Sequence, residues 1–106
     1  MNYYAAVRAF LVTSELGSFS IAAKTLSVNA STVSHYVSGL EAELGVELFS
    51  RSTRGVILTE WGLTFRERVR GAVDALNEAR AATLVFRDAD AEMMASVRRR
   101  QKGRPH

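Results

Sequence analysis

The amino-acid sequence predicts a mainly α-helical fold with one short β-hairpin and a long C-terminal helix. Apolar residues recur at three- and four-residue steps through most of the chain, which is the period of an α-helix. Gly17 and Gly45 each follow such a stretch, and glycine commonly ends a helix because it adopts the left-handed conformation. Only residues 47–58 depart from the helical period, and the single proline is Pro105. These observations predict several helices interrupted once by β structure.

Two helices are predicted first, over residues 3–16 and 19–26. In the first, Val7 and Phe10 belong to a stripe of apolar side chains at helical spacing. Ser18 precedes the second helix and is placed to cap it, since a serine oxygen accepts a hydrogen bond from a backbone N–H group. A very short turn therefore separates the two helices.

A third helix is predicted from its N-cap, Asn29, to Leu44. One of its faces is apolar. The opposite face carries Ser31, His35 and Ser38, which can form hydrogen bonds but include no lysine or arginine. The residues predicted to lie in the core are Val33, Val37, Leu40 and Leu44.

Residues 47–58 predict a β-hairpin that forms a wing beside the helices. Two short β-prone pieces flank a polar turn that contains Arg51, Arg54 and Gly55. Thr59 can then cap a final helix, and Glu60 in its first turn favours that N-terminus electrostatically.

The final helix is predicted over residues 60–97. Seven residues between positions 65 and 86, six of them apolar, follow an unbroken alternation of four- and three-residue steps, which is typical of a coiled-coil seam. A single long helix on a small domain has nothing of its own to bury this seam against, so self-association is the simplest expectation. Packing of the seam on the first helix of the same chain is the alternative. The residues expected in the dimerisation seam are Phe65, Val69, Ala72, Leu76, Ala79, Thr83 and Phe86.

The charge of the chain is unevenly distributed. Its 106 residues carry a formal net charge of +3. Residues 98–106 contain five basic groups and no acidic group, so residues 1–97 have a net charge of −2. The basic balance by itself therefore does not indicate DNA binding. We expect a winged domain over 1–59, a dimerisation helix over 60–97 and a basic disordered tail over 98–106.

Composition excludes several classes of function. The chain has no cysteine, and its only histidines are His35 and His106, so neither a disulfide nor a His/Cys metal cluster is expected. No hydrolase, nucleotide-binding or metalloprotease motif occurs. We therefore expect no catalytic residue, no cofactor and no metal. No apolar run approaches the roughly 18–20 residues of a membrane span, and no signal peptide is visible, which favours a cytoplasmic protein without a membrane partner.

The second and third predicted helices form a helix-turn-helix candidate over residues 18–44. In such a unit the second helix enters the major groove of double-stranded DNA with its N-terminal end first. Serine and threonine hydroxyls can donate or accept there, and arginines of a wing reach phosphates or the minor groove. The candidate DNA-binding residues are Ser18, Asn29, Ala30, Ser31, Thr32, Ser34, His35, Arg51 and Arg54.

The chain resembles the N-terminal winged helix-turn-helix of LysR-type transcriptional regulators over residues 3 to about 86. The resemblance rests on an ordered pattern of many positions, among them Gly17-Ser18-Phe19-Ser20, Val33-Ser34, Leu40-Glu41 and Leu48-Phe49. It implies a bacterial, cytoplasmic, nucleoid-associated regulator of transcription that binds double-stranded DNA. It also implies dimerisation through the final helix, usually by antiparallel packing, with the recognition helix in the major groove and the wing on the DNA backbone.

The chain departs from the pattern of that family at the reading positions and in length. The family often has Gln at the position of Ala30 and Arg at that of His35, where His also occurs. It often has Gln at the position of Tyr36 and a basic residue at that of Ser38. An arginine pairs bidentately with guanine, whereas a neutral histidine offers one donor and one acceptor, so base readout is expected to differ from the usual pattern. Residues 98–106 stand where an effector-binding domain normally begins, so no small-molecule effector is expected.

Two other functions stay open at this point. The chain can be an interaction protein that forms a heterodimer with a full-length relative through its final helix and modifies that regulator. It can also be a truncated product that folds without regulating anything. Of the three functions, the residues most favour a homodimer that binds DNA and recognises its sequence.

Overall fold

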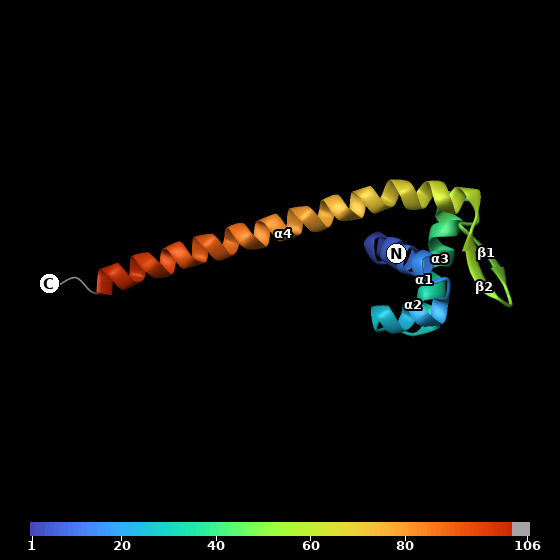
Figure 1. The fold of residues 1–106 in the computed structure, drawn as a ribbon, viewed down its shortest axis with the longest axis horizontal. Helices are drawn as coiled ribbons and strands as arrows, with labels where there is room; N and C mark the ends of the chain where they lie inside the picture. Colours follow the sequence, from blue (N-terminus) through green and yellow to red (C-terminus); the bar gives the residue numbers. More distant parts are fainter. Residues whose placement is uncertain (103–106) are drawn as a thin grey trace. The chain divides into compact units, whose positions relative to one another are not determined.

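The computed structural model describes the backbone of residues 1–102 and the side chains of residues 1–100. The chain divides into two compact units, Met1–Gly71 and the segment from Ala72 onward. The last helix begins in the first unit and continues into the second. In chain order the elements are α1 (Tyr3–Leu16), α2 (Phe19–Leu26), α3 (Ala30–Leu44), β1 (Phe49–Ser52), β2 (Gly55–Leu58) and α4 (Glu60–Lys102) (Figure 1). The predicted mainly helical fold with a short β wing is confirmed.

The core of the first unit lies where α1, α2 and α3 pack on one another. Phe10 of α1 is fully buried, and its ring lies 5.3 Å from the ring of Phe49 in β1 and 5.2 Å from that of Phe65 in α4, centroid to centroid. One aromatic side chain thus joins the hairpin and the start of α4 to the helical core. The buried apolar residues of this core are Ala6, Val7, Ala9, Phe10, Ala22, Ala23, Val33, Val37, Leu40, Leu48 and Phe49.

Each of the first three helices begins at a side-chain cap. Asn2, Ser18 and Asn29 accept hydrogen bonds from the backbone N–H groups of Ala5, Ile21 and Thr32, respectively. Such caps satisfy N–H groups that have no partner within the helix. The caps at Ser18 and Asn29 were predicted from the sequence and are confirmed.

The helices end in left-handed residues. Gly17 and Gly45 have φ values of 68° and 73°, as their positions in the sequence predicted. Ser27 ends α2 with φ 59° and, among the described residues, is the only residue other than glycine with a positive φ. This conformation reverses the chain within Ser27–Asn29 and sets α3 directly after α2.

The wing is an antiparallel pair in which Phe49 faces Leu58 and Ser52 faces Gly55. The backbone of Gly55 has φ 122°, and a Cβ atom there would lie 2.9 Å from the carbonyl oxygen of Gly17. The next residue, Val56, donates its N–H to the same carbonyl oxygen at 3.4 Å. The second strand of the wing is therefore anchored to the turn between α1 and α2.

The first turn of α4 packs closely on the residues that directly precede β1. Thr59 donates its hydroxyl to the carbonyl of Glu47 at 2.6 Å and accepts the N–H of Gly62 at 3.1 Å, which confirms it as the predicted cap. A Cβ atom at Gly62 would lie 2.1 Å from the carbonyl oxygen of Leu48, too close for any other residue without a shift of the backbone. The glycine permits this close approach.

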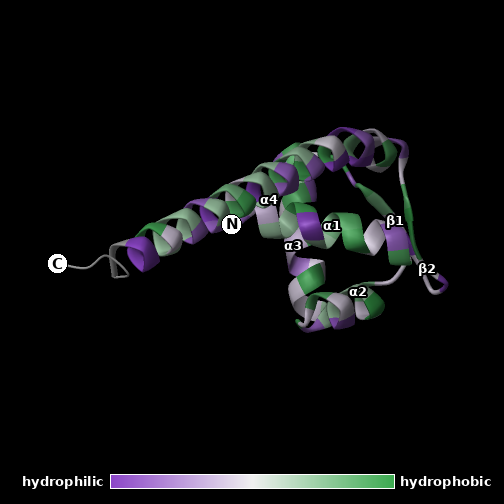
Figure 2. Cartoon of the chain, turned by 60° about the vertical axis from the view of Figure 1, so that its left-hand side comes forward, coloured by the Kyte–Doolittle hydropathy of each residue, from purple (hydrophilic) through white to green (hydrophobic). Residues whose placement is uncertain are grey.

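Helix α4 is longer than the sequence predicted. We expected the helix to stop at residue 97 and a disordered tail to follow, but α4 continues to Lys102, so that expectation is wrong for residues 98–102. No glycine or proline interrupts this stretch, arginine favours helices, and basic residues stabilise a helix C-terminus. Residues 103–106 lie outside the described part of the chain. Figure 2 shows hydrophobic positions recurring along α4 before its hydrophilic end.

One predicted core residue lies outside the core. Leu44 is 40% exposed, whereas Val33, Val37 and Leu40 are fully buried. Leu44 is the last residue of α3, and Gly45 turns the chain away directly after it. The apolar stripe of α3 thus extends one position beyond the core.

Among the described residues, no helix is long and apolar enough to cross a membrane.

Candidate nucleic-acid interface

The exposed face of α3 is the centre of the candidate interface. Val33, Val37 and Leu40 are fully buried and hold one side of the helix in the core. Ser31 and His35, one turn apart, lie on the opposite side and are exposed. Because three buried residues determine the rotation of α3 about its axis, Ser31 and His35 necessarily face solvent.

A network of hydrogen bonds orders the N-terminal end of α3. The side-chain oxygen of Asn29 accepts the backbone N–H of Thr32 at 2.8 Å. It also accepts the hydroxyls of Ser31 and Thr32, each at 2.7 Å. Asn29 itself is exposed.

Several predicted reading residues are less exposed than expected. The sequence predicts Ala30, Thr32 and Ser34 as DNA-binding residues of α3, which requires exposed side chains. In the structure all three are half-buried. Ala30 packs against the buried cluster that contains Ala22 and Val33. Its small side chain therefore lies partly in the core.

Ser18 is placed as a cap rather than as an open hydroxyl. Its oxygen accepts the N–H of Ile21 at 3.3 Å at the start of α2. The N-terminus of α2 is thus ordered by Ser18.

The two wing arginines have different surroundings. Arg51 forms an ion pair with Glu41 at 2.8 Å, and its guanidinium carbon lies 5.1 Å from the centre of the Phe19 ring. Arg54 lies in the two-residue turn between the strands, and no ion pair involves its side chain among the described residues. Arg54 is therefore the more available of the two cations.

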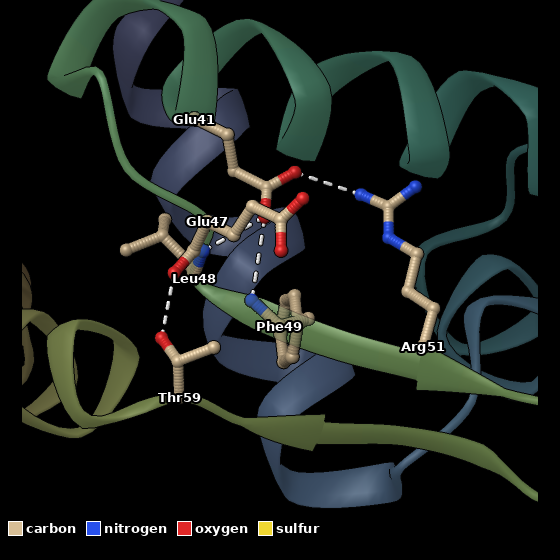
Figure 3. Close-up of polar contacts among 6 residues, drawn as sticks. All are labelled: Glu41, Glu47, Leu48, Phe49, Arg51 and Thr59. Atoms are coloured by element: carbon tan, nitrogen blue, oxygen red, sulfur yellow. Dashed lines mark hydrogen bonds and ion pairs between the residues drawn. The ribbon is translucent and has the colours of Figure 1, made fainter.

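Sequence reasoning missed Glu41 as an organising residue (Figure 3). Its Oε2 atom accepts the backbone N–H groups of Leu48 at 2.8 Å and Phe49 at 3.3 Å, while Oε1 accepts from Arg51. The side chain is only 13% exposed. Glu41 thus fastens the first strand of the wing to α3. An acidic residue ten positions before an arginine is too common a spacing to have signalled this contact.

The predicted seam residues of α4 fall into two groups. Phe65 packs on Phe10 within the first unit, and Val69 is half-buried. The alternative prediction, that the seam packs on the first helix of the same chain, is therefore confirmed for Phe65. The other members are exposed, with Leu76 at 46% and Phe86 at 77%. These exposed members are Ala72, Leu76, Ala79, Thr83 and Phe86.

The described residues contain no group of three or more His, Cys, Asp or Glu side chains that could hold a metal ion. What they contain instead is two helices joined by a tight turn, an exposed polar face on the second helix and an adjoining β wing. This arrangement defines the class of winged helix-turn-helix DNA-binding domains.

Comparison with known proteins identifies the family. The model of bacterial regulatory helix-turn-helix proteins of the LysR family matches residues 4–63. The chain belongs to the LysR family, and the matched segment is its helix-turn-helix domain.

Similar proteins carry the names of transcriptional regulators. A probable hydrogen peroxide-inducible genes activator of Mycobacterium leprae is 42% identical over 78 residues, which are 74% of this chain and 25% of that protein. The HTH-type transcriptional regulator DsdC of Escherichia coli K12 is 42% identical over 69 residues, 65% of this chain and 22% of that protein. The chain thus spans about a quarter of the length of these relatives.

Solved structures give the same assignment. The crystal structure of the CbnR DNA-binding domain in complex with DNA is 31% identical to this chain. The likeness has a TM-score of 0.66 and covers 91% of this chain and 99% of that one. The fold assigned above is therefore that of LysR-family DNA-binding domains.

Proposed function

We propose that this protein binds double-stranded DNA sequence-specifically as a homodimer and regulates transcription. The observation that carries the proposal is the exposed face of α3 around Ser31 and His35, held outward by buried valines within a LysR-family domain. A helix in this position can enter the major groove with its N-terminal end leading. The free Arg54 at the wing tip is suited to a phosphate, which positions a protein without specifying sequence.

The second unit supports pairing with another copy. Leu76 and Phe86 are exposed on the predicted seam, and Met93, which continues the same spacing, is 67% exposed. Exposed apolar residues at heptad spacing are covered in coiled-coil dimers. A homodimer would present two copies of α3, and its DNA site would have two-fold symmetry.

This mode of action requires no small-molecule effector, because both DNA reading and pairing use residues of the described chain. We place the protein with the nucleoid in the cytoplasm, where its proposed ligand is found.

A salt-titrated selection from random duplex DNA tests the proposal. We expect the purified chain to enrich a two-fold site, with the logarithm of the association constant falling linearly with the logarithm of salt concentration. The slope divided by about 0.9 counts the phosphates that the protein neutralises. Absence of binding at low salt, or a flat response to salt, would contradict the proposal.

A double variant separates DNA reading from pairing. Replacing His35 and Arg54 by alanine should weaken DNA binding at least about tenfold, since two surface contacts are worth roughly 1 kcal/mol each or more. The oligomeric state should not change. If the double variant retained full regulatory activity in cells, the chain would act through pairing with a relative rather than by reading DNA.

A further inference from the structure

Three donors converge on one atom at the start of α3. The Oδ1 atom of Asn29 accepts from the backbone N–H of Thr32 at 2.8 Å, from the hydroxyl of Ser31 at 2.7 Å and from the hydroxyl of Thr32 at 2.7 Å. Two of these donors are side chains on the face or flank of the helix proposed to read DNA.

The direction of these bonds follows from chemistry. A backbone N–H can only donate, so the Asn29 atom that it meets is the carbonyl oxygen and not the amide nitrogen. A carbonyl oxygen carries no hydrogen, so Ser31 and Thr32 must both donate to it. Each hydroxyl has a single hydrogen, and each therefore offers only lone pairs to any further partner.

Ser31 has the more favourable place of the two. It is exposed, as is His35 one turn later, whereas Thr32 is half-buried at the flank. At about 100° per residue, Ser31 lies opposite the buried stripe formed by Val33 and Leu40. The outward lone pairs of Ser31 thus point where a base edge would lie if α3 occupied the major groove.

We propose that Asn29 is a specificity-positioning residue that turns Ser31 into a hydrogen-bond acceptor, so that this end of α3 selects an exocyclic amino group in the major groove. This inference rests on the proposed DNA binding. In that groove adenine N6 and cytosine N4 donate, whereas guanine O6 and N7 and thymine O4 accept. A serine hydroxyl is usually indifferent between the two kinds of base, because it can rotate to donate or accept. Asn29 removes that freedom.

The consequence is a preference at one base position of the site. To donate to guanine or thymine, Ser31 would first have to give up its bond to Asn29. A single net hydrogen bond corresponds to about a fivefold preference for the amino-bearing base over the accepting one. This preference differs from the guanine reading that an arginine on the same face would produce.

Base analogues test which atom is read. After selection with the full chain, binding is measured by fluorescence anisotropy to the selected duplex and to duplexes that replace one base at a time. Purine in place of adenine removes only the N6 amino group, and 2-pyrimidinone in place of cytosine removes only the N4 amino group. We expect one of these analogues to weaken binding about fivefold at one position in each half-site. Full affinity for every analogue duplex would overturn the inference.

Variants of the cap test the role of Asn29. Glycine is tolerated at an N-cap at a cost of only a few tenths of a kcal/mol, so Asn29→Gly should fold while freeing both hydroxyls. We expect it to lose the preference at that position, so that amino-bearing and accepting bases bind within about twofold. Ser31→Ala should lose the preference as well. Asn29→Asp is the matched control: its carboxylate still accepts all three bonds, so overall affinity falls by charge repulsion while the preference is retained.

The outcomes distinguish the inference from the proposed function. If Asn29→Gly and Ser31→Ala both keep the wild-type base preference, the inference is wrong and DNA binding stands. If the wild-type chain selects no sequence at low salt, the proposed function fails and this inference fails with it. Helical content measured by circular dichroism shows that each variant is folded before its preference is compared.

Discussion

At the scale of single residues, the least expected feature is a buried hydroxyl. Thr13 lies on α1 with no exposed surface, and its hydroxyl oxygen has no hydrogen-bond partner. A buried polar group without a partner destabilises the folded state. Local sequence cannot reveal this, because threonine is common on both faces of helices and its burial depends on what packs against α1.

Thr13→Val should therefore stabilise the protein. Valine has nearly the same shape and removes the unpaired hydroxyl, so we expect a gain of about 0.5–1 kcal/mol in the free energy of unfolding. Urea denaturation at one fixed protein concentration measures it. Ser14→Ala is the control, because the hydroxyl of Ser14 already donates to the carbonyl of Leu11 at 2.7 Å and its removal brings no such gain. A loss of stability in Thr13→Val would show that the hydroxyl is satisfied.

At the scale of elements, the wing depends on one carboxylate. Glu41 of α3 accepts two backbone N–H groups at the start of β1 and pairs with Arg51 further along the strand. Leu48 and Phe49, whose N–H groups it receives, are buried, so water is a poor substitute for the carboxylate. The position of the wing beside α3 thus rests on a contact between segments distant in sequence.

Glu41→Ala should lower the free energy of unfolding by about 2–3 kcal/mol, because two buried N–H groups lose a charged acceptor. Arg51→Ala should cost about 1 kcal/mol or less, since the exposed side of the ion pair is hydrated. Comparing the two variants by urea denaturation separates the backbone contacts from the ion pair. Equal losses in both would mean that the ion pair, and not the strand anchoring, holds the wing.

At the scale of the whole molecule, the main feature is the apolar seam of α4, which is exposed in a single chain. Leu76→Asp should raise the dissociation constant of the proposed dimer at least about 100-fold, because a charge would enter an apolar interface in both copies. Analytical ultracentrifugation measures the change. Val85→Asp is the matched control, since Val85 is 69% exposed and lies on the side of α4 opposite Leu76. If the control variant also dissociates, the interface is not the predicted seam.

The basic end of the chain has its own expected effect. Deleting residues 98–106 removes five positive charges. We expect weaker binding to all DNA sequences alike and a shallower dependence on salt, because fewer counterions are released. Repeating the DNA selection with the deleted form provides the measurement, and the selected site should be unchanged. A different site would mean that these residues contact bases.

Much of this fold can be predicted from local sequence patterns. The caps at Ser18, Asn29 and Thr59 and the left-handed Gly17 and Gly45 depend on neighbouring residues only, so the helix limits follow from the chain itself. The apolar period of α3 likewise predicts which side faces outward. The limit of α4 was harder to predict, because a run of arginines reads as a charged tail as readily as a helix end.

Packing decided what local patterns leave open. Which side chains are free to contact a ligand or a second copy depends on partners from other parts of the chain. Arg51 pairs with Glu41, Ala30 packs against the core, and the ring of Phe65 packs on that of Phe10. Residues at equivalent positions in the sequence pattern therefore differ in how exposed and how available their side chains are. The physical reason is that spacing determines only the direction of a side chain, whereas hydrogen bonds, ion pairs and burial require a second element at a defined distance.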